Sequence, residues 1–179
     1  MTNVPVPATP VEAVVREQFD AFYHREFRGL VRLAMVLVDS QEQAEEVVQD
    51  AFATAYRRWS EVAAYDDPLA WVRKVMVNNA MSRGRRLRRE VLALRRFGGR
   101  PSPVPSPIDA PDQELWTLVS TLPKQQAAAI ALHYVDDLSI ESIATVLGCS
   151  TGSVKTHLSR GRHTLASRLT SLTKKDDSE

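Results

Sequence analysis

Residues Ile140 to Leu158 read IESIATVLGCSTGSVKTHL, and their pattern is the most informative in the chain. Ala144 puts a small side chain where two successive helices would approach each other closely, and Gly148 tolerates the positive φ of a tight turn between them. Apolar side chains at helical spacing would anchor the second helix on the first: Ile143, Leu147 and Val154. This pattern predicts a helix-turn-helix.

The outer face of the second helix carries short polar and cationic groups. With the inner face anchored, the side chains that project outward are Thr151, Ser153, Lys155, Thr156, Ser159 and Arg160. Such groups suit base edges and phosphates in a major groove, and Arg162, His163 and Arg168 follow at positions that reach a DNA backbone. A helical hairpin whose polar face only meets water is the alternative. Ser150, a good N-cap for the second helix, favours DNA binding when it is taken together with Lys155 and Arg160.

Helical periodicity continues on both sides of this motif, and neither side shows the alternation of strands. Upstream, we expect a helix ending near residue 38 and a second one capped by Ser40 and Gln43. A third starts with Asp67 as N-cap and Pro68 at the first helical position, and ends in an arginine run near Gly84. Downstream, helices are expected over about 112–121, 123–135 and 139–147, with the last starting at Ser150. The fold class is all-α, in two helical lobes.

A proline-rich segment separates the lobes. Gly98 to Pro111, GGRPSPVPSPIDAP, holds five of the ten prolines in the chain. Alternating proline removes backbone donors and favours an extended chain, so we read this segment as a flexible linker. The expected domains are therefore 12–97 and 112–173, with the linker at 98–111.

The net charge of +1 conceals two charged surfaces of opposite sign. One helix carries an acidic face with no base from Asp39 to Asp50, and its polar members are Asp39, Glu42, Glu45, Glu46, Gln49 and Asp50. Eight arginines stand against one acid between Arg83 and Arg100. Either run could be only a solvated surface, and a basic segment could lie on a membrane, although this one lacks an adequate apolar face. The asymmetry favours two charged partners.

Composition excludes several classes of function. Cys149 is the only cysteine, which rules out an internal disulfide and cysteine-based zinc sites, and the four histidines show no metal-ligand spacing. We therefore expect no metal and no cofactor. Met1 to Pro10 lacks the basic start and apolar core of a signal peptide, and no apolar run is long enough to span a bilayer. We expect a cytoplasmic protein with no membrane insertion.

The whole chain, over about residues 15–172, resembles the extracytoplasmic-function sigma factors of bacterial RNA polymerase, in an actinobacterial-like version. Leu122 to Leu165 resembles the family's domain 4, whose last helix reads the −35 promoter element. Asp39 to Trp59 resembles the helix that docks on the clamp of the polymerase β′ subunit. Asp66 to Arg86 resembles the part that melts and reads the −10 element. The three motifs follow one another in the order of the family.

The resemblance implies roles for individual residues. It places the family's −35 contacts at Lys155, Thr156, Ser159 and Arg160. The neighbouring polar residues Thr151, Ser153 and Arg162 complete the predicted −35 surface. The resemblance places a captured base in the loop at about 62–69, which holds Asp66 and Asp67, with Asn78 and Asn79 lining the single strand. The density of the arginine run predicts that its members contact phosphates, among them Arg83, Arg85 and Arg86. The resemblance assigns polymerase binding to the acidic face, Asp39, Glu42, Glu45, Glu46, Gln49 and Asp50. His157 and Ser159 depart from the aromatic or arginine of some members, so the −35 sequence does not carry over.

The implied partners are core RNA polymerase, through its β′ clamp and β flap, promoter DNA and an anti-sigma factor. The implied function is transcription initiation, in a stress or envelope response, without catalysis by this chain. The alternative is a stand-alone helix-turn-helix regulator. An enzyme acting on DNA would need converging carboxylates or an activated nucleophile, and the pattern offers neither. In the free protein we expect the two lobes to pack together and hide both DNA-reading surfaces.

Overall fold

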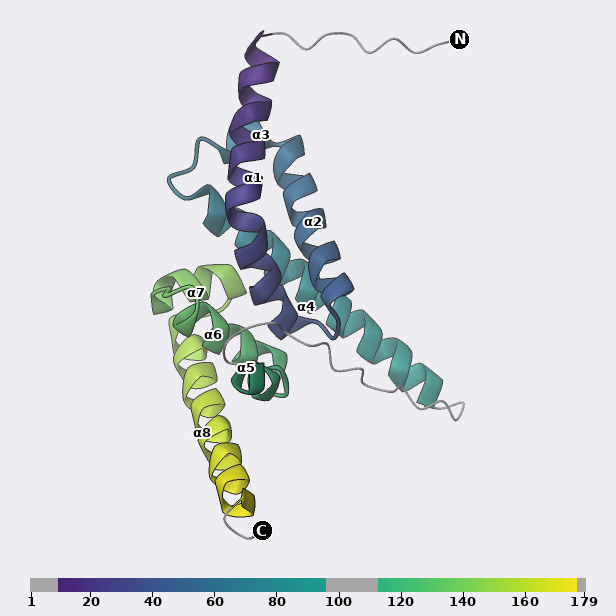
Figure 1. The fold of residues 1–179 in the computed structure, drawn as a ribbon, viewed down its shortest axis with the longest axis vertical. Coiled ribbons are helices and arrows are strands. Elements are labelled where there is room, and N and C mark those ends of the chain that lie inside the picture. Colours follow the sequence, from purple (N-terminus) through teal and green to yellow (C-terminus); the bar gives the residue numbers. More distant parts are fainter. Residues whose placement is uncertain (1–9, 96–112, 177–179) are drawn as a thin grey trace.

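The computed structural model describes residues 10–95 and 113–176, and within them the chain forms eight helices and no strand. The N-terminal lobe contains α1 (Pro10–Leu37), α2 (Gln41–Arg57), the short α3 (Trp59–Val62) and α4 (Pro68–Arg95). The C-terminal lobe contains α5 (Gln113–Ser120), α6 (Lys124–Tyr134), α7 (Ile140–Leu147) and α8 (Thr151–Asp176). Figure 1 shows the two lobes in contact, with α8 extending away from the N-terminal lobe. The predicted all-α class is confirmed, and the predicted linker lies outside the described residues.

The core of the N-terminal lobe lies between α1, α2 and α4. The apolar stripe of α2 is buried along its whole length, at Ala44, Val47, Val48, Ala51, Phe52 and Ala55. Phe52 is packed edge-on against Phe19 and Phe22 of α1, with ring centroids 6.2 and 5.8 Å away. Each fully buried side chain of this size contributes about 1.5–3 kcal/mol, so this stripe fixes α2 against α1.

Local capping sets the helix starts in this lobe. The Ser40 hydroxyl accepts from the backbone N–H of Gln43 at 3.2 Å, and the Gln43 side chain accepts from the N–H of Asp39 at 3.4 Å. The Asp67 carboxylate accepts from the N–H of Ala70 at 2.9 Å, directly before Pro68 starts α4. Both predicted caps are confirmed. In a standard capping box the Gln43 side chain would accept from the N–H of Ser40 itself, whereas here it accepts from the N–H of Asp39, one residue earlier.

The predicted end of the third helix near Gly84 is wrong, because α4 continues to Arg95. A single glycine inside a helix costs about 1 kcal/mol relative to alanine, whereas arginine is among the better helix formers. The arginines on both sides of Gly84 therefore favour continuation. Arg83 is thus held on a rigid helix and not on a frayed end.

The C-terminal lobe is built around α6. Its residues Ala127 to Leu132 are all buried, and α8 packs across them. At the crossing, a β-carbon on Gly161 would lie 3.0 Å from Ile130 Cγ1, so only glycine allows this approach without movement of a neighbour. The Ser139 and Ser150 hydroxyls cap α7 and α8, each accepting a backbone N–H at 3.1 Å. These two caps are as predicted.

The lobes are joined by ion pairs as well as by apolar contact. α1 packs on α5 and α6, and α4 packs on α7. Arg73 of α4 donates through Nε to the carboxylate of Asp136 at 2.7 Å, and both side chains are largely buried. Lys124 Nζ lies 3.4 Å from Asp39 Oδ1 at a more exposed place. The expectation that the lobes pack together is thus met in this structure.

Candidate nucleic-acid and partner interfaces

The helix-turn-helix has the predicted internal geometry. Gly148 ends α7 in the left-handed region, with φ 63°, and its N–H donates to the carbonyl of Ala144. Ile143 and Val154 are completely buried between the two helices, and Leu158 is nearly so. Leu147, the third expected anchor, is only half-buried, and Val146 is the buried residue that the sequence reading missed. The turn therefore holds the first two turns of α8 in a fixed orientation.

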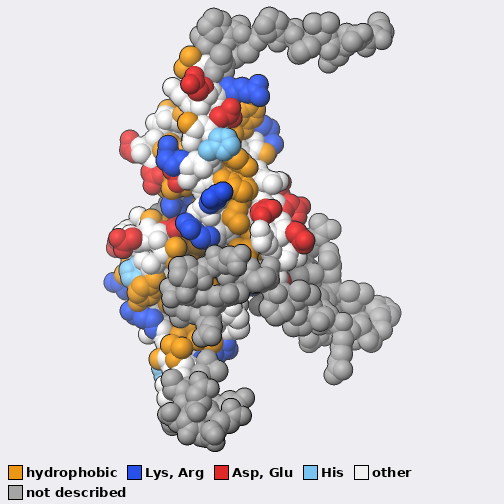
Figure 2. Space-filling model, viewed as in Figure 1, with side chains coloured by type: hydrophobic (Ala, Val, Ile, Leu, Met, Phe, Trp, Pro, Cys, Tyr) orange, Lys and Arg blue, Asp and Glu red, His pale blue; other side chains and the backbone are white. Residues whose placement is uncertain are grey.

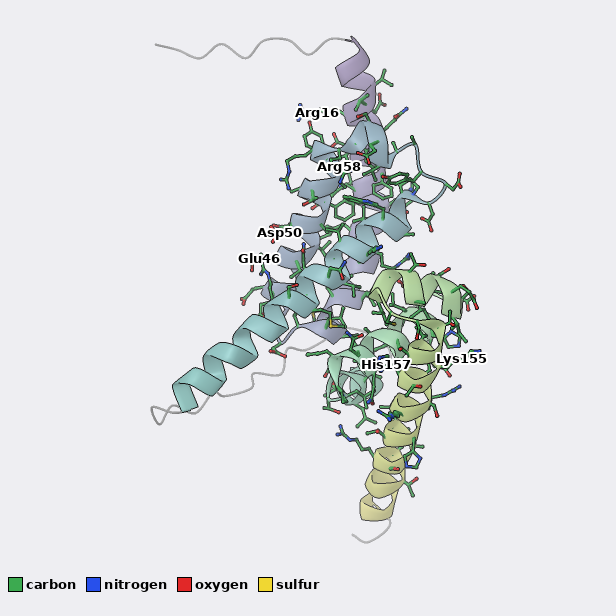
Figure 3. All side chains as sticks on the ribbon, turned by 180° about the vertical axis from the view of Figure 1, so that it is seen from behind. Arg16, Glu46, Asp50, Arg58, Lys155 and His157 are labelled. Carbon is green, nitrogen blue, oxygen red and sulfur yellow. The ribbon has the colours of Figure 1, made fainter. Side chains whose placement is uncertain are left out.

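The outer face of α8 is open to solvent. Six of the seven residues predicted for −35 recognition are exposed: Thr151, Lys155, Thr156, Ser159, Arg160 and Arg162. The seventh, Ser153, is half-buried, and its hydroxyl lies 2.9 Å from that of Ser150. The Thr156 hydroxyl donates to the carbonyl of Gly152 at 2.9 Å. Lys155 lies at the outer side of α8 in Figure 3. This face presents two classes of donor, cations and hydroxyls, from one rigid helix.

A second polar region lies at the start of α4. The chain between α3 and α4 is exposed from Ala63 to Asp67, within the segment predicted to hold a captured base. Asn78 is exposed and Asn79 is half-buried one position later. Of the two predicted acids, Asp67 caps α4 through the N–H of Ala70, whereas Asp66 is exposed and does not cap the helix.

The sequence reading did not single out Tyr65, an aromatic side chain in this exposed segment. Tyr65 is 40% exposed, and its hydroxyl donates to Glu61 at 2.8 Å. That hydrogen bond raises the pKa of Tyr65, so the hydroxyl stays a neutral donor. Nearby, the Arg58 guanidinium pairs with Glu61 and lies over the Trp71 ring, 5.8 Å from its centroid. An exposed aromatic ring beside cations is the kind of surface on which an unpaired base stacks. The sequence feature that could have indicated Tyr65 is that it is the single aromatic residue in a loop otherwise made of alanine and aspartate.

The acidic face of α2 is exposed, and part of it is paired within the chain. Asp39, Glu42, Glu46, Gln49 and Asp50 are exposed, while Glu45 is half-buried and accepts from Gln41. Figure 2 shows acidic side chains gathered beside the apolar surface between α1 and α2. An open cavity of about 370 Å³ lies there, walled chiefly by Phe19, Tyr23, Phe52 and Tyr56. The acidic face therefore borders an aromatic groove.

Two charged sets that the sequence assigned to different partners meet in the structure. Arg83 of α4 pairs with Glu46 at 2.5 Å and with Asp50 at 2.9 Å. The hydrogen bond from Arg83 is the main cause that lowers the pKa of the Glu46 carboxyl. Figure 3 shows Glu46 and Asp50 side by side along α2. The side chains of Arg85 and Arg86 lie outside the described residues.

The expectation that closed lobes hide both DNA-reading surfaces is wrong for these side chains. Lys155, Thr156 and Arg160 stay exposed while the lobes are packed, and so does Asn78. The contact joins α1 to α5 and α6, and α4 to α7, while the polar outer face of α8 stays exposed. Packing of the lobes therefore fixes the relative placement of the two surfaces but does not cover them.

Other kinds of site find no support in the part of the chain that is described. No cluster of three His, Cys, Asp or Glu in residues 10–95 and 113–176 could hold a metal ion. Among the same residues, no helix combines the length and the apolarity needed to cross a bilayer. Cys149, in the turn, is half-buried, and burial raises the pKa of its thiol.

The fold and its surfaces define a class, that of two-lobed helical DNA-binding proteins with a helix-turn-helix in the second lobe. Sigma-70 region 2 matches residues 22–90, and Sigma-70, region 4 matches residues 112–165. ECF RNA polymerase sigma factor SigM of Mycobacterium tuberculosis is 29% identical over 84% of this chain and 76% of its own length. RNA polymerase sigma-E factor of Streptomyces coelicolor is 26% identical over 80% of this chain and 81% of its own length.

Solved structures show the same fold. The sigma factor RpoE of Bartonella quintana, crystallised with the anti-sigma factor NepR, aligns with a TM-score of 0.72 at 24% identity, over 86% of this chain and 98% of that one. CnrH, solved with the cytosolic domain of CnrY, aligns with a TM-score of 0.61 at 22% identity, over 87% of this chain and 90% of that one. The chain belongs to the extracytoplasmic-function sigma factors of bacterial RNA polymerase. It is a transcription initiation factor that directs core polymerase to promoters, and the match to region 2 disfavours a stand-alone regulator.

Proposed function

We propose that the outer face of α8 reads the −35 element, through Lys155, Thr156, Ser159 and Arg160, with Thr151, Ser153 and Arg162 at its edges. The observation that carries this assignment is the exposure of these donors on a helix whose opposite side is anchored by Val154 and Leu158. A rigid helix with short polar side chains and an arginine such as Arg160 suits bidentate contact to a base pair in the major groove.

The start of α4 and the loop before it take the −10 element in this proposal. Asp66 and Tyr65 border the pocket for an unpaired base, and Asn78 and Asn79 follow along the strand. Arg83, Arg85 and Arg86 meet the phosphates. Extrusion of a base costs a few kcal/mol, and contacts of the base with a polar-edged loop and a stacking ring can offset that cost.

The acidic face of α2 docks on the β′ clamp, and α5 to α8 sit near the β flap. Support comes from the exposure of the acids and from their place beside the aromatic groove, since a docking surface combines an apolar centre with a charged rim. The protein works in the cytoplasm, where the polymerase is, in a stress or envelope response. Phosphodiester formation belongs to the polymerase and not to this chain.

An anti-sigma factor is a further partner in this proposal. RpoE of Bartonella quintana and CnrH were each solved with a protein bound to them. In this chain a regulator would act by holding the lobes in their packed arrangement, because that arrangement fixes the two DNA-reading surfaces at one separation. Polymerase would hold the lobes apart at the spacing of the promoter elements.

Run-off transcription with purified core polymerase and a library of promoter fragments tests the proposal. We expect selective transcripts only when the protein is present, and the selected fragments give the −10 and −35 sequences together. Absence of transcripts and of co-elution with core polymerase would contradict the proposal. As a matched comparison, Lys155→Ala should lower −35-dependent transcription, while Lys74→Ala, an exposed cation of α4 outside the predicted sites, should not.

A further inference from the structure

Arg83 occupies a place where two of the proposed binding surfaces meet. Its guanidinium lies 2.5 Å from Glu46 and 2.9 Å from Asp50, with a second bond from Nη2 to Glu46 at 2.9 Å. Glu46 and Asp50 are one helical turn apart on α2, so their charges repel each other when no cation lies between them. Arg83 bridges both from the neighbouring helix.

Arg83 also lies on the side of α4 along which the proposed function places the −10 strand. Asn79 and Arg83 are four residues apart, which places them on one face of the helix. A strand that follows Asn78 and Asn79 toward the end of α4 would bring a phosphate to Arg83. The guanidinium cannot give the same donors to that phosphate and to both carboxylates.

The ion pair is open to exchange. The side chain of Arg83 is 37% exposed, and those of Glu46 and Asp50 are 59% and 55% exposed. Exposed pairs contribute little because water solvates both charges well, so a competing cation or phosphate displaces them readily. Neither the acids nor the arginine must move through a packed core to change partner.

We propose that Arg83 couples polymerase docking to binding of single-stranded DNA. This inference rests on the proposed function, in which cations of the polymerase dock on the acidic face of α2. When those cations take Glu46 and Asp50, Arg83 is released to a DNA phosphate. Linkage makes the effect reciprocal, so a strand that captures Arg83 uncovers the two acids for the polymerase. Arg83 is a positioning residue whose state depends on both ligands.

The test uses the full chain without polymerase and a fluorescein-labelled oligodeoxythymidine as the probe. The double variant Glu46→Gln/Asp50→Asn releases Arg83 and should strengthen DNA binding. Loss of two negative charges strengthens it in any case, so the control is Glu42→Gln/Glu45→Gln, which removes the same charge from the same helix. Glu42 and Glu45 form none of the ion pairs described for Arg83.

We expect the first variant to bind about threefold more tightly than the control, the scale of an exposed ion pair. Release of one cation to a phosphate should also steepen the slope of log K against log salt by about 0.7. Both differences should vanish when Arg83→Ala is added to each variant. Equal affinities and slopes for the two variants would overturn the inference, and so would a difference that persists without Arg83.

A second measurement addresses the polymerase. Arg83→Ala removes the internal competitor for Glu46 and Asp50, so the variant should bind core polymerase about threefold more tightly than the native chain, measured by fluorescence anisotropy at low salt. Unchanged or weaker binding would overturn the coupling. Run-off transcription with the native chain separates the sigma function from the Arg83 coupling. If transcription succeeds and the Arg83 tests fail, the sigma function stands and only the coupling is removed.

Discussion

The ion pair between Arg73 and Asp136 gives the sharpest test of how the lobes are held together. The substitution Arg73→Met keeps much of the side-chain length and removes the charge. Asp136 then lies in the interface between the lobes without its nearest cation. Burial already outweighs Arg73 in its effect on Asp136, because the pKa of this carboxyl is raised in spite of the pair. Loss of Arg73 adds to the free-energy cost of burying the ionised Asp136 carboxylate.

The magnitude follows from the burial of the pair. Removal of one partner from a buried ion pair costs about 3–5 kcal/mol. Arg32 also attracts Asp136, more weakly, so we take the lower end. About 3 kcal/mol corresponds to a shift of about a hundredfold from packed toward separated lobes. Separation lets Asp136 return to water, so the packed arrangement alone carries the cost.

Acid should reverse the effect. A carboxyl whose pKa is raised in the packed arrangement contributes stability that is present below its ordinary pKa and is lost as the pH rises through the raised value. The variant should therefore be more compact near pH 4 than near neutral pH, as measured by the radius of gyration in small-angle X-ray scattering. The double variant Arg73→Met/Asp136→Leu should be compact at both pH values, since apolar pairs replace buried ion pairs well. A single variant that scatters as the native chain does at neutral pH would refute this reasoning.

Three further predictions concern the C-terminal lobe. Arg160→Ala should weaken −35-dependent transcription by about 1–3 kcal/mol if the arginine contacts a base edge, and unchanged promoter strength would remove that assignment. Gly161→Ala should lower the free energy of unfolding in urea by about 1–3 kcal/mol, because its β-carbon would lie 3.0 Å from Ile130 Cγ1. Gly152→Ala is the control, with its nearest atom at 3.8 Å, and an equal loss would contradict the packing argument. Cys149 should react with iodoacetamide more slowly than a small free thiol at neutral pH, since burial raises its pKa, and an equal rate would contradict this.

Local chemistry was readable from the sequence. Ser40, Asp67, Ser139 and Ser150 each cap a helix as predicted, because a cap needs only the next three residues of the chain. The left-handed turn at Gly148 was predictable for the same reason. The exposed face of α8 followed from these local features, since an anchored inner side determines which side chains point outward.

Contacts between distant segments were not readable in this way. Arg73 and Asp136 are 63 positions apart, and their pairing depends on how α4 crosses the C-terminal lobe. The approach of Gly161 to Ile130 depends likewise on the crossing of α8 over α6. The continuation of α4 past Gly84 differs from the predicted helix end, because a glycine beside an arginine run fits a helix end as well as a helix interior. The contact of Arg83 with Glu46, 37 positions away, likewise depends on how α4 crosses α2.

The two sets of ion pairs differ in the property that decides what each can do. Arg73 and Asp136 have only 8% and 16% of their side chains exposed, so separating them requires separating the lobes. Glu46 and Asp50 are more than half exposed, and they can change partner while every helix stays in place. The buried pair therefore responds to the conformation of the chain, whereas the exposed set can respond directly to ligands. A small polymerase cation or a phosphate can compete for Arg83 and its acids directly, whereas only a partner large enough to bind both lobes can act on Arg73 and Asp136.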